Sequence, residues 1–209
     1  MTEFTSAFRD DLRRLMQWRR DVRRFRTDPV DEALLRECLD TFLLAPSVGL
    51  SEPWRVIRLE SDQARAAALK NYEGANAEAL KGYDGDRAAL YANLKLSGMQ
   101  ESPVQLAIYC DDATEKGQGL GAATMPEMRR YSVVGAITQF WLTARSFGLG
   151  VGWVSILDPD ALNRDLDVPS EWSLVAYLCV GWPEELSDTP ELAKAGWEDR
   201  DTALPIQSR

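Results

Sequence analysis

The amino-acid sequence predicts a single α+β domain. Stripes of apolar residues at helical spacing dominate the chain, and about four short apolar segments have the length of strands. Helices and strands do not alternate strictly along the chain, which favours α+β over a doubly wound sheet. The 209 residues, 45% of them hydrophobic, can bury one sizeable core, and no repeat, linker or low-complexity segment divides them. We therefore expect one domain over residues 1–209.

The chain begins with two predicted helices. Residues 8–16 carry apolar side chains at helical spacing, so the first helix ends close to a cluster of arginines. Residues 34–43 carry a second apolar stripe, and either Asp28 or Asp31 is a suitable N-terminal cap for it. The turn residues at 45–49 end this helix and open a loop.

The rest of the chain supplies strands, further helices and one long loop. In order, we expect a strand over 54–59, helices near 62–80 and 86–100, a strand over 104–110, a mobile loop over 111–124, the longest helix over 126–147, strands over 151–156 and 174–180, and a tail over about 183–209. The longest helix is apolar on more than one side, which predicts that it is buried in a core or at a subunit interface.

The composition excludes several kinds of chemistry. The chain has no histidine, so Ser-His-Asp and Cys-His catalysis and the usual zinc and non-haem iron sites are excluded. Cys38, Cys110 and Cys179 lie in apolar stretches without a CxxC pair, which favours buried structural thiols over disulfides. We therefore expect no metal, and acid–base chemistry that uses carboxylates, hydroxyls, lysine, tyrosine or a cofactor.

Charge and hydropathy limit the kinds of partner that the protein can bind and the compartment in which we expect it. A net charge of −9 disfavours general nucleic-acid binding. No segment approaches the roughly 20 apolar residues of a membrane span, and the first residues lack the pattern of a signal peptide. We expect a cytoplasmic protein that binds neither nucleic acid nor a membrane.

One local exception to this acidic character is a cluster of five arginines within residues 19–26. Guanidinium groups bind phosphates bidentately, so Arg19, Arg20 and Arg23 are candidates for a phosphate site. Asp21 lies among these cations, where an ionised carboxylate can accept hydrogen bonds or simply form salt bridges. The alternative interpretation of the cluster is a solvated basic surface.

Two further motifs can contact a ligand. The loop APSVGLSEPW at 45–54 offers backbone amides and the hydroxyl of Ser47 to an oxygen-rich ligand, although an ordinary loop fits the same residues. The segment GVGWVSI at 150–156 contains glycines that allow close approach of a flat ligand, with Ser155 where the strand ends, but it also fits an ordinary strand. Neither the GxGxxG nor the GxxxxGK[ST] spacing of nucleotide-binding loops is present.

Taken together, these motifs resemble the nitroreductase family over residues 15–200. A narrower resemblance, to the BluB-type 5,6-dimethylbenzimidazole synthases, rests on WRRDVR at 18–23, APSVG at 45–49, TMPEM at 124–128 and GVGWVSI at 150–156. Typical nitroreductases have Ser or Thr where this chain has Asp21, and Asn after the APS loop where it has Gly49. Both departures agree with the narrower group.

The resemblance implies a nitroreductase-like fold, in which helices flank a mixed or antiparallel sheet and two subunits intertwine as a homodimer. The tail at 183–209 would wrap onto the partner subunit. Reduced FMN would be a substrate rather than a retained cofactor, and would be fragmented with molecular oxygen to 5,6-dimethylbenzimidazole, the lower ligand of cobalamin. A separate flavin reductase could supply the reduced FMN.

The resemblance also implies a flavin site at the subunit interface. Asp21 would manage protons and orient the adduct of flavin and oxygen, and Ser155 would hydrogen-bond the isoalloxazine ring; these two are the candidate catalytic residues. The loop at 111–124 would close over the site. The residues that would bind FMN are Arg19, Arg20, Asp21, Val22, Arg23, Ser47, Leu96, Ser155 and, from the tail, Arg200.

Two other functions fit the same motifs. One is an NAD(P)H-dependent FMN nitroreductase or quinone reductase, which needs room above the flavin for nicotinamide and then for an acceptor. The other is a non-catalytic flavin-binding protein, which would need the arginines and Ser47 but neither Asp21 nor Ser155.

Overall fold

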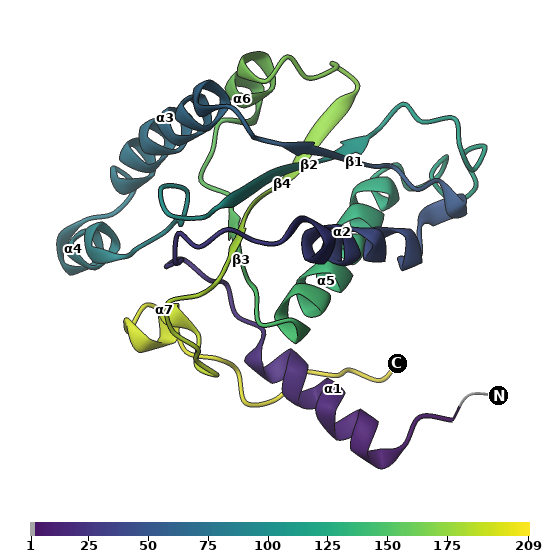
Figure 1. Ribbon diagram of the computed structural model, residues 1–209, viewed down its shortest axis with the longest axis horizontal. Helices are drawn as coiled ribbons and strands as arrows, with labels where there is room; N and C mark the ends of the chain where they lie inside the picture. Colours follow the sequence, from purple (N-terminus) through teal and green to yellow (C-terminus); the bar gives the residue numbers. More distant parts are fainter. Residues whose placement is uncertain (1–2) are drawn as a thin grey trace.

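A four-stranded sheet lies between two layers of helices in the computed structural model, which describes residues 3–209 (Figure 1). The strands are β1 (Trp54–Arg58), β2 (Val104–Asp111), β3 (Gly150–Val154) and β4 (Trp172–Gly181). Their order across the sheet is β1-β2-β4-β3, and each neighbouring pair is antiparallel. The predicted α+β fold with an antiparallel sheet is therefore confirmed.

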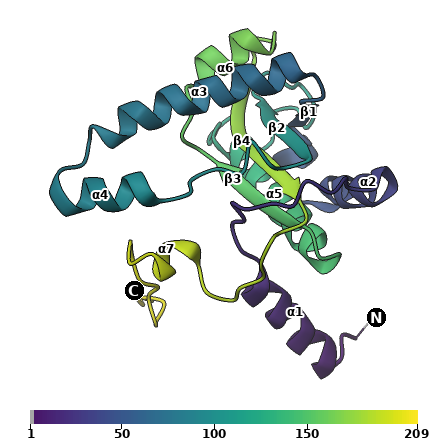
Figure 2. The same ribbon diagram turned by 60° about the vertical axis from the view of Figure 1, so that its left-hand side comes forward.

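The helices divide between the two faces of the sheet. They are α1 (Ser6–Trp18), α2 (Glu32–Asp40), α3 (Asp62–Leu80), α4 (Gly85–Asn93), α5 (Met128–Ser146), α6 (Pro159–Asp165) and α7 (Glu191–Lys194), with 3-10 turns at Thr41–Leu44 and Val48–Leu50. Helices α3 and α6 cover one face, and α2 and α5 cover the other (Figures 1 and 2). Among residues 3–209, no helix is both long and apolar enough to cross a membrane.

Strand β2 lies at the centre of the hydrophobic core. Its side chains alternate between the two faces, so Leu106 and Ile108 pack in the core under α5, while Ala107 and Tyr109 pack in the core under α3 and α6. All four are at most 1% exposed. Burial on both faces explains why residues 106–110 of this strand form a continuous apolar run in the sequence.

Two helix boundaries differ from the sequence-based prediction. The stripe at 34–43 is α-helical only to Asp40, after Asp31 caps it, and then tightens into a 3-10 turn. The helix expected to reach residue 100 ends at Asn93, because Leu94 is extended, with a ψ of 130°. The carbonyl of Lys95 instead accepts a hydrogen bond from Arg23 (3.2 Å), so the segment after α4 joins the arginine cluster.

Helix α6 is missing from the sequence-based prediction, although its start signal is present. The side chain of Asp158 accepts from the amide of Ala161 (3.0 Å), and Pro159 occupies the first helical position. The strand expected over 151–156 stops at Val154, so Ser155 lies just beyond β3.

The arginine segment at 19–26 lies along β3, the edge strand of the sheet. Asp21 and Val151 form a parallel bridge, and the amide of Val22 donates to the carbonyl of Val151 (3.0 Å). A Cβ atom at Gly152 would lie only 2.1 Å from the carbonyl oxygen of Val22, so this close approach requires glycine at that position.

We expect Gly152→Ala to lower the free energy of unfolding by about 1–3 kcal/mol, because the added methyl group must push the arginine segment away from β3. Urea unfolding followed by circular dichroism measures this change. Gly74→Ala is the matched control: nothing lies within 4 Å of a Cβ there, in the middle of α3. This control should stabilise the protein by about 0.5–1 kcal/mol, and equal effects of the two variants would contradict the packing argument.

Candidate functional site

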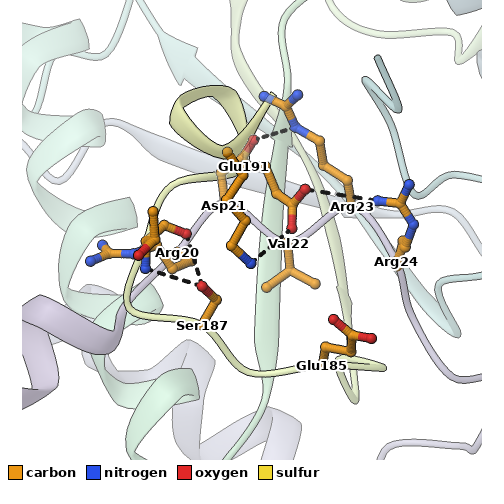
Figure 3. Close-up of a pocket in the computed structure, with 10 residues that line it drawn as sticks. Arg20, Asp21, Val22, Arg23, Arg24, Glu185, Ser187 and Glu191 are labelled. Carbon is orange, nitrogen blue, oxygen red and sulfur yellow. Dashed lines mark hydrogen bonds and ion pairs between the residues drawn. The ribbon is translucent and has the colours of Figure 1, made fainter. Parts of the chain in front are cut away.

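The arginine segment and the C-terminal tail enclose a polar cavity of about 380 Å³ (Figure 3). The tail approaches because Glu184 donates its amide to the carbonyl of Arg24 (3.1 Å) and Phe25 bridges to Pro183. Residues of both signs of charge line the cavity: Arg20, Asp21, Val22, Arg23, Arg24, Glu185, Ser187, Thr189, Glu191 and Lys194.

Asp21 is held by both of its carboxylate oxygens. Oδ1 accepts a hydrogen bond from the backbone amide of Trp153 on β3 (2.7 Å). Oδ2 accepts from Nε of Arg23 (2.9 Å), and the side chain of Asp21 remains 32% exposed. The carboxylate is therefore fixed in orientation but accessible from the cavity.

Arg23 positions Asp21. Its side chain is 15% exposed, and besides its ion pair with Asp21 it donates from Nη1 to the carbonyl of Lys95 (3.2 Å). Lys95 is the neighbour of Leu96, so the structure brings this predicted contact close to the arginine cluster. Two of the five N–H groups of Arg23 are thus used within the protein, and they fix its side chain between Asp21 and the segment that contains Leu96.

Arg19 and Arg20 contribute two positive charges to the site. The guanidinium of Arg19 stacks over Trp141, with Cζ 4.6 Å from the ring centroid, and no side-chain hydrogen bond of Arg19 occurs within residues 3–209. Arg20 donates from Nε to the carbonyl of Asp188 (2.9 Å) and from Nη1 to the carbonyl of Arg19 (2.6 Å).

Arg200 joins these two arginines from the tail. It lines a second cavity, of about 260 Å³, together with Arg19, Arg20 and Arg23. Burial lowers the pKa of both Arg19 and Arg20, and the neighbouring positive charge of Arg200 lowers both further. The charge on each guanidinium is therefore less well stabilised here than in water, and an anion bound among the three would offset that cost.

Ser155 follows directly after β3 and is exposed. Ser155 stands two residues beyond Trp153, whose amide donates to Asp21. Two residues of extended chain place the Cα atoms of Trp153 and Ser155 about 7 Å apart. The hydroxyl of Ser155 makes no hydrogen bond within residues 3–209, and is free to contact a ligand beside Asp21.

Ser47 lies in a different place from the arginine segment. Its loop follows α2 on one side of the molecule, whereas the arginine segment passes β3 and α7 on the other side (Figures 1 and 2). The hydroxyl of Ser47 accepts from the amide of Glu52 (3.0 Å). A single chain therefore does not bring all the predicted binding residues together.

The loop at 111–124 packs against the Ser47 loop. A Cβ atom at Gly49 would lie 2.8 Å from the carbonyl of Leu120, and Lys116 forms an ion pair with Glu52. The two loops interlock through their backbones, so a movement of one is expected to displace the other.

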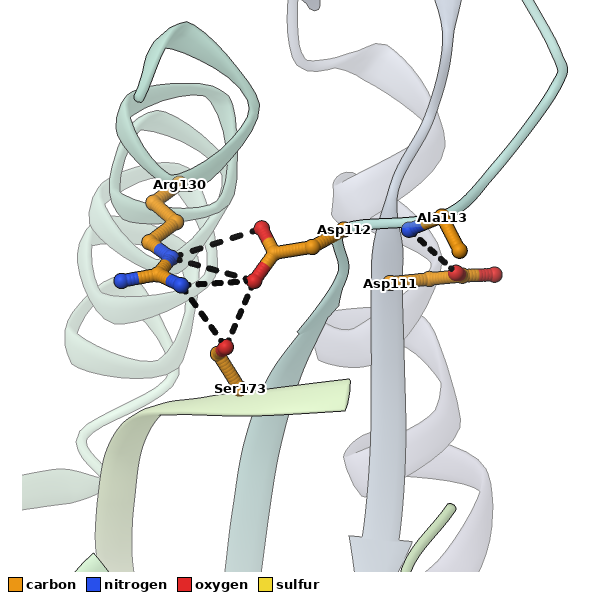
Figure 4. Close-up of polar contacts among 5 residues, drawn as sticks. All are labelled: Asp111, Asp112, Ala113, Arg130 and Ser173. Atoms are coloured by element: carbon orange, nitrogen blue, oxygen red, sulfur yellow. Dashed lines mark hydrogen bonds and ion pairs between the residues drawn. The ribbon is translucent and has the colours of Figure 1, made fainter. Parts of the chain in front are cut away.

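Three polar residues that the sequence did not single out fix the start of α5 (Figure 4). Asp112, just after β2, pairs with Arg130 (2.7 Å) and accepts from the hydroxyl of Ser173 on β4 (2.5 Å). Burial acts to raise the pKa of Asp112, but the hydrogen bonds from Arg130 and Ser173 outweigh it and the pKa is lowered. The cluster ties the N-terminal end of the loop at 111–124 to β4 and to the first turn of α5.

The three cysteines are buried and unpaired. Burial raises the pKa of Cys38 to about 11 and those of Cys110 and Cys179 to about 12. Within residues 3–209, no group of three or more Cys, Asp or Glu side chains is placed to hold a metal ion.

We expect the thiols to react slowly in the native protein at pH 8. A pKa raised above the pH keeps the thiol protonated, and two pKa units lower the thiolate fraction by about a hundredfold. Absorbance after addition of a disulfide reagent, with and without denaturing urea, tests this: all three should react rapidly only when unfolded. Rapid native reaction of any one thiol would contradict their burial.

The chain resembles proteins of known family over most of its length. The profile of the Nitroreductase family matches residues 16–182. The chain belongs to the nitroreductase family. Within it, this chain is 53% identical over 197 residues to a 5,6-dimethylbenzimidazole synthase of Rhodospirillum rubrum, covering 94% of this chain and 93% of that protein.

Two further comparisons agree with this placement. A 5,6-dimethylbenzimidazole synthase of Rhodobacter capsulatus is 46% identical, covering 94% of this chain and 95% of that protein. The crystal structure of oxidized iodotyrosine deiodinase bound to FMN and 3-iodo-L-tyrosine superposes with a TM-score of 0.76 at 20% identity, covering 95% of this chain and 99% of that one. The latter match confirms the nitroreductase fold.

Arg23→Gln should lower the free energy of unfolding by about 1.5–3 kcal/mol, since it removes a charge-assisted hydrogen bond to Asp21 from a nearly buried position. The matched control is Arg24→Gln. Arg24 is 52% exposed and its ion pair with Glu191 spans 3.9 Å, so its removal should change stability by less than about 0.5 kcal/mol. Urea titrations compare the two, and equal losses would show that the Asp21 pair does not stabilise the site.

Proposed function

We propose that this nitroreductase-family protein is a 5,6-dimethylbenzimidazole synthase, which fragments reduced FMN with molecular oxygen. The observation that carries the proposal is Asp21, fixed between the arginine cluster and the strand that leads to Ser155. The relatives at 53%, 46% and 44% identity over 94% of the chain, each a 5,6-dimethylbenzimidazole synthase, support it.

The donors present fit a phosphorylated flavin. Arg19 has no acceptor for its side chain within residues 3–209, and Arg20 retains two of its five N–H groups after its bonds to Asp188 and Arg19. Arg19, Arg20 and Arg200 would hold the phosphate, for which three guanidinium groups are suited. Reduced FMN would supply the electrons that reduce oxygen, and fragmentation of its ring would consume it as a substrate.

Asp21 and Ser155 would supply the polar groups beside the flavin ring, each with its own role. Each oxygen of Asp21 accepts one N–H group, which holds the carboxylate in one orientation and leaves lone pairs that can accept a proton or a further hydrogen bond. Ser155 would donate its unpaired hydroxyl to the ring. Arg23 would keep Asp21 oriented, and the backbone of Val22 and the segment around Leu96 would form the walls.

A homodimer would complete the site. Proteins of this family are typically homodimers with FMN at the interface. Ser47 of the partner subunit would then contact the flavin, and the partner's loop at 111–124 would exclude water. Large apolar side chains exposed beside that loop and on α5 support such an interface: Leu43, Leu44, Leu50, Leu120, Met125, Tyr131 and Val134.

The proposal places the protein in the cytoplasm, where a separate flavin reductase would supply reduced FMN. It needs no metal. The C-terminal residues 201–209, which are exposed in the structure, remain the part of the tail that is proposed to reach the partner.

The deciding experiment mixes the purified protein with reduced FMN under air and measures 5,6-dimethylbenzimidazole by chromatography and mass spectrometry. We expect the product with wild type, and a loss of at least about a hundredfold in Asp21→Asn and Ser155→Ala. Both variants should still bind FMN, because the phosphate donors are intact. Intact flavin, reoxidised with only hydrogen peroxide formed, would overturn the proposal and direct the next assay to NAD(P)H-dependent reduction of nitroaromatics or quinones.

A further inference from the structure

The tail crosses the phosphate end of the site as a strap, defined here as residues 183–200. Pro183 bridges to Phe25, Glu184 donates to the carbonyl of Arg24 (3.1 Å), and the carbonyl of Asp188 accepts from Nε of Arg20 (2.9 Å). These three contacts attach the first half of the strap to the arginine segment on its own chain.

Trp197 anchors the second half on α4. Its ring meets that of Tyr83 edge-on, with centroids 5.4 Å apart at 81°, and lies 6.1 Å from the ring of Tyr91. The guanidinium of Arg87 sits over Trp197, 4.0 Å from its centroid. Tyr83, Arg87 and Tyr91 thus form an aromatic cage around Trp197. The hydroxyl of Tyr91 donates to Asn76 of α3 (2.8 Å), which ties the cage to a second helix.

The chain geometry links this cage to the charge cluster. Helix α7 ends at a glycine with φ +72°, Gly196, and the amide of Trp197 closes the turn by donating to Leu192 (2.9 Å). Arg200 follows Trp197 by three residues, a span of at most about 10 Å. Pro190, Glu191 and Leu192 of the strap line the same 260 Å³ cavity as Arg19, Arg20 and Arg200.

We infer that Trp197 is a positioning residue: held in its aromatic cage, it fixes the strap so that Arg200 completes a three-guanidinium site that selects a flavin bearing a terminal phosphate over riboflavin. Riboflavin offers a neutral hydroxyl in place of the dianion and would leave the three positive charges unbalanced. The inference rests on the proposed function only in taking a flavin as the ligand.

The strap also explains why Arg20 is ready for a phosphate. The carbonyl of Asp188 orients the guanidinium of Arg20 by accepting hydrogen bonds from Nε and from one N–H of Nη2. One N–H each on Nη1 and Nη2 stays available. The contacts at Pro183, Glu184 and Asp188 do not involve Trp197, so loss of the aromatic cage would displace Arg200 and leave Arg20 in place.

Flavin binding provides the test, because it needs no turnover. Affinities for oxidised FMN and for riboflavin are measured by flavin fluorescence for wild type, Trp197→Ala, Trp197→Phe, Arg200→Gln and the double variant Trp197→Ala/Arg200→Gln. Trp197→Ala and Arg200→Gln should each weaken FMN about tenfold and riboflavin less than about twofold, as expected for the loss of one charge-assisted contact. Trp197→Phe keeps an aromatic ring in the cage and should restore wild-type FMN affinity.

The double variant separates positioning from general stability. If Trp197 acts through Arg200, the double variant binds FMN no more weakly than either single variant, since the two residues contribute one interaction. Equal weakening of FMN and riboflavin by Trp197→Ala, or multiplied losses in the double variant, would overturn the inference. Selective loss of FMN binding without any 5,6-dimethylbenzimidazole from wild type would instead uphold the inference and refute the proposed function.

Discussion

The contact between the arginine segment and the edge strand β3 organises the site. The hydrogen bond from Val22 to Val151 and the bond from Trp153 to the carboxylate of Asp21 fix two consecutive residues on one strand. Gly152 makes the contact possible, because any side chain there would collide with the carbonyl of Val22. This contact with β3 sets the directions in which the side chains of the neighbouring arginines leave the backbone.

Phe25 secures the other end of the same segment. It is 1% exposed, and a Cβ atom at Gly98 would lie 2.4 Å from its ring, so the chain after α4 passes directly against it. The same ring lies 3.3 Å from the position of a Cβ at Gly181, at the end of β4. The segment is thus attached to the sheet at Val22 and to the core at Phe25, and the polar side chains between and beside them line the cavity together with Val22.

The sequence was sufficient for the local features and insufficient for the long-range ones. The helical and strand periodicities located α1, α3, β1, β2 and α5, and the order of the motifs indicated the family, since each signal is confined to a few neighbouring residues. The cage of Trp197 joins residues more than a hundred positions apart in the sequence, and no local pattern announces such a contact. The early end of α4 has the same cause, because a tertiary bond from Arg23 replaces the helical one.

The position of Ser47 could not have come from periodicity either, because only the path of the whole chain places its loop on the other side of the molecule from the arginine segment.

The absence of histidine from the chain places the proton chemistry on few groups. Burial raises the pKa of Tyr109 to about 12 and that of Tyr177 still further, and it also raises the pKa of each of the three thiols, so none of these is ready to exchange protons near neutral pH. Of the carboxylates that line the cavity, Glu191 is engaged by Arg24 and Lys194 on the tail side. Asp21 has both carboxylate oxygens held by N–H donors, one of them the amide of Trp153 on β3, the strand that Ser155 follows. The protein therefore contributes one oriented carboxylate, one free hydroxyl and a cluster of cations, which is a set suited to holding a reactive, phosphorylated substrate that brings its own redox chemistry.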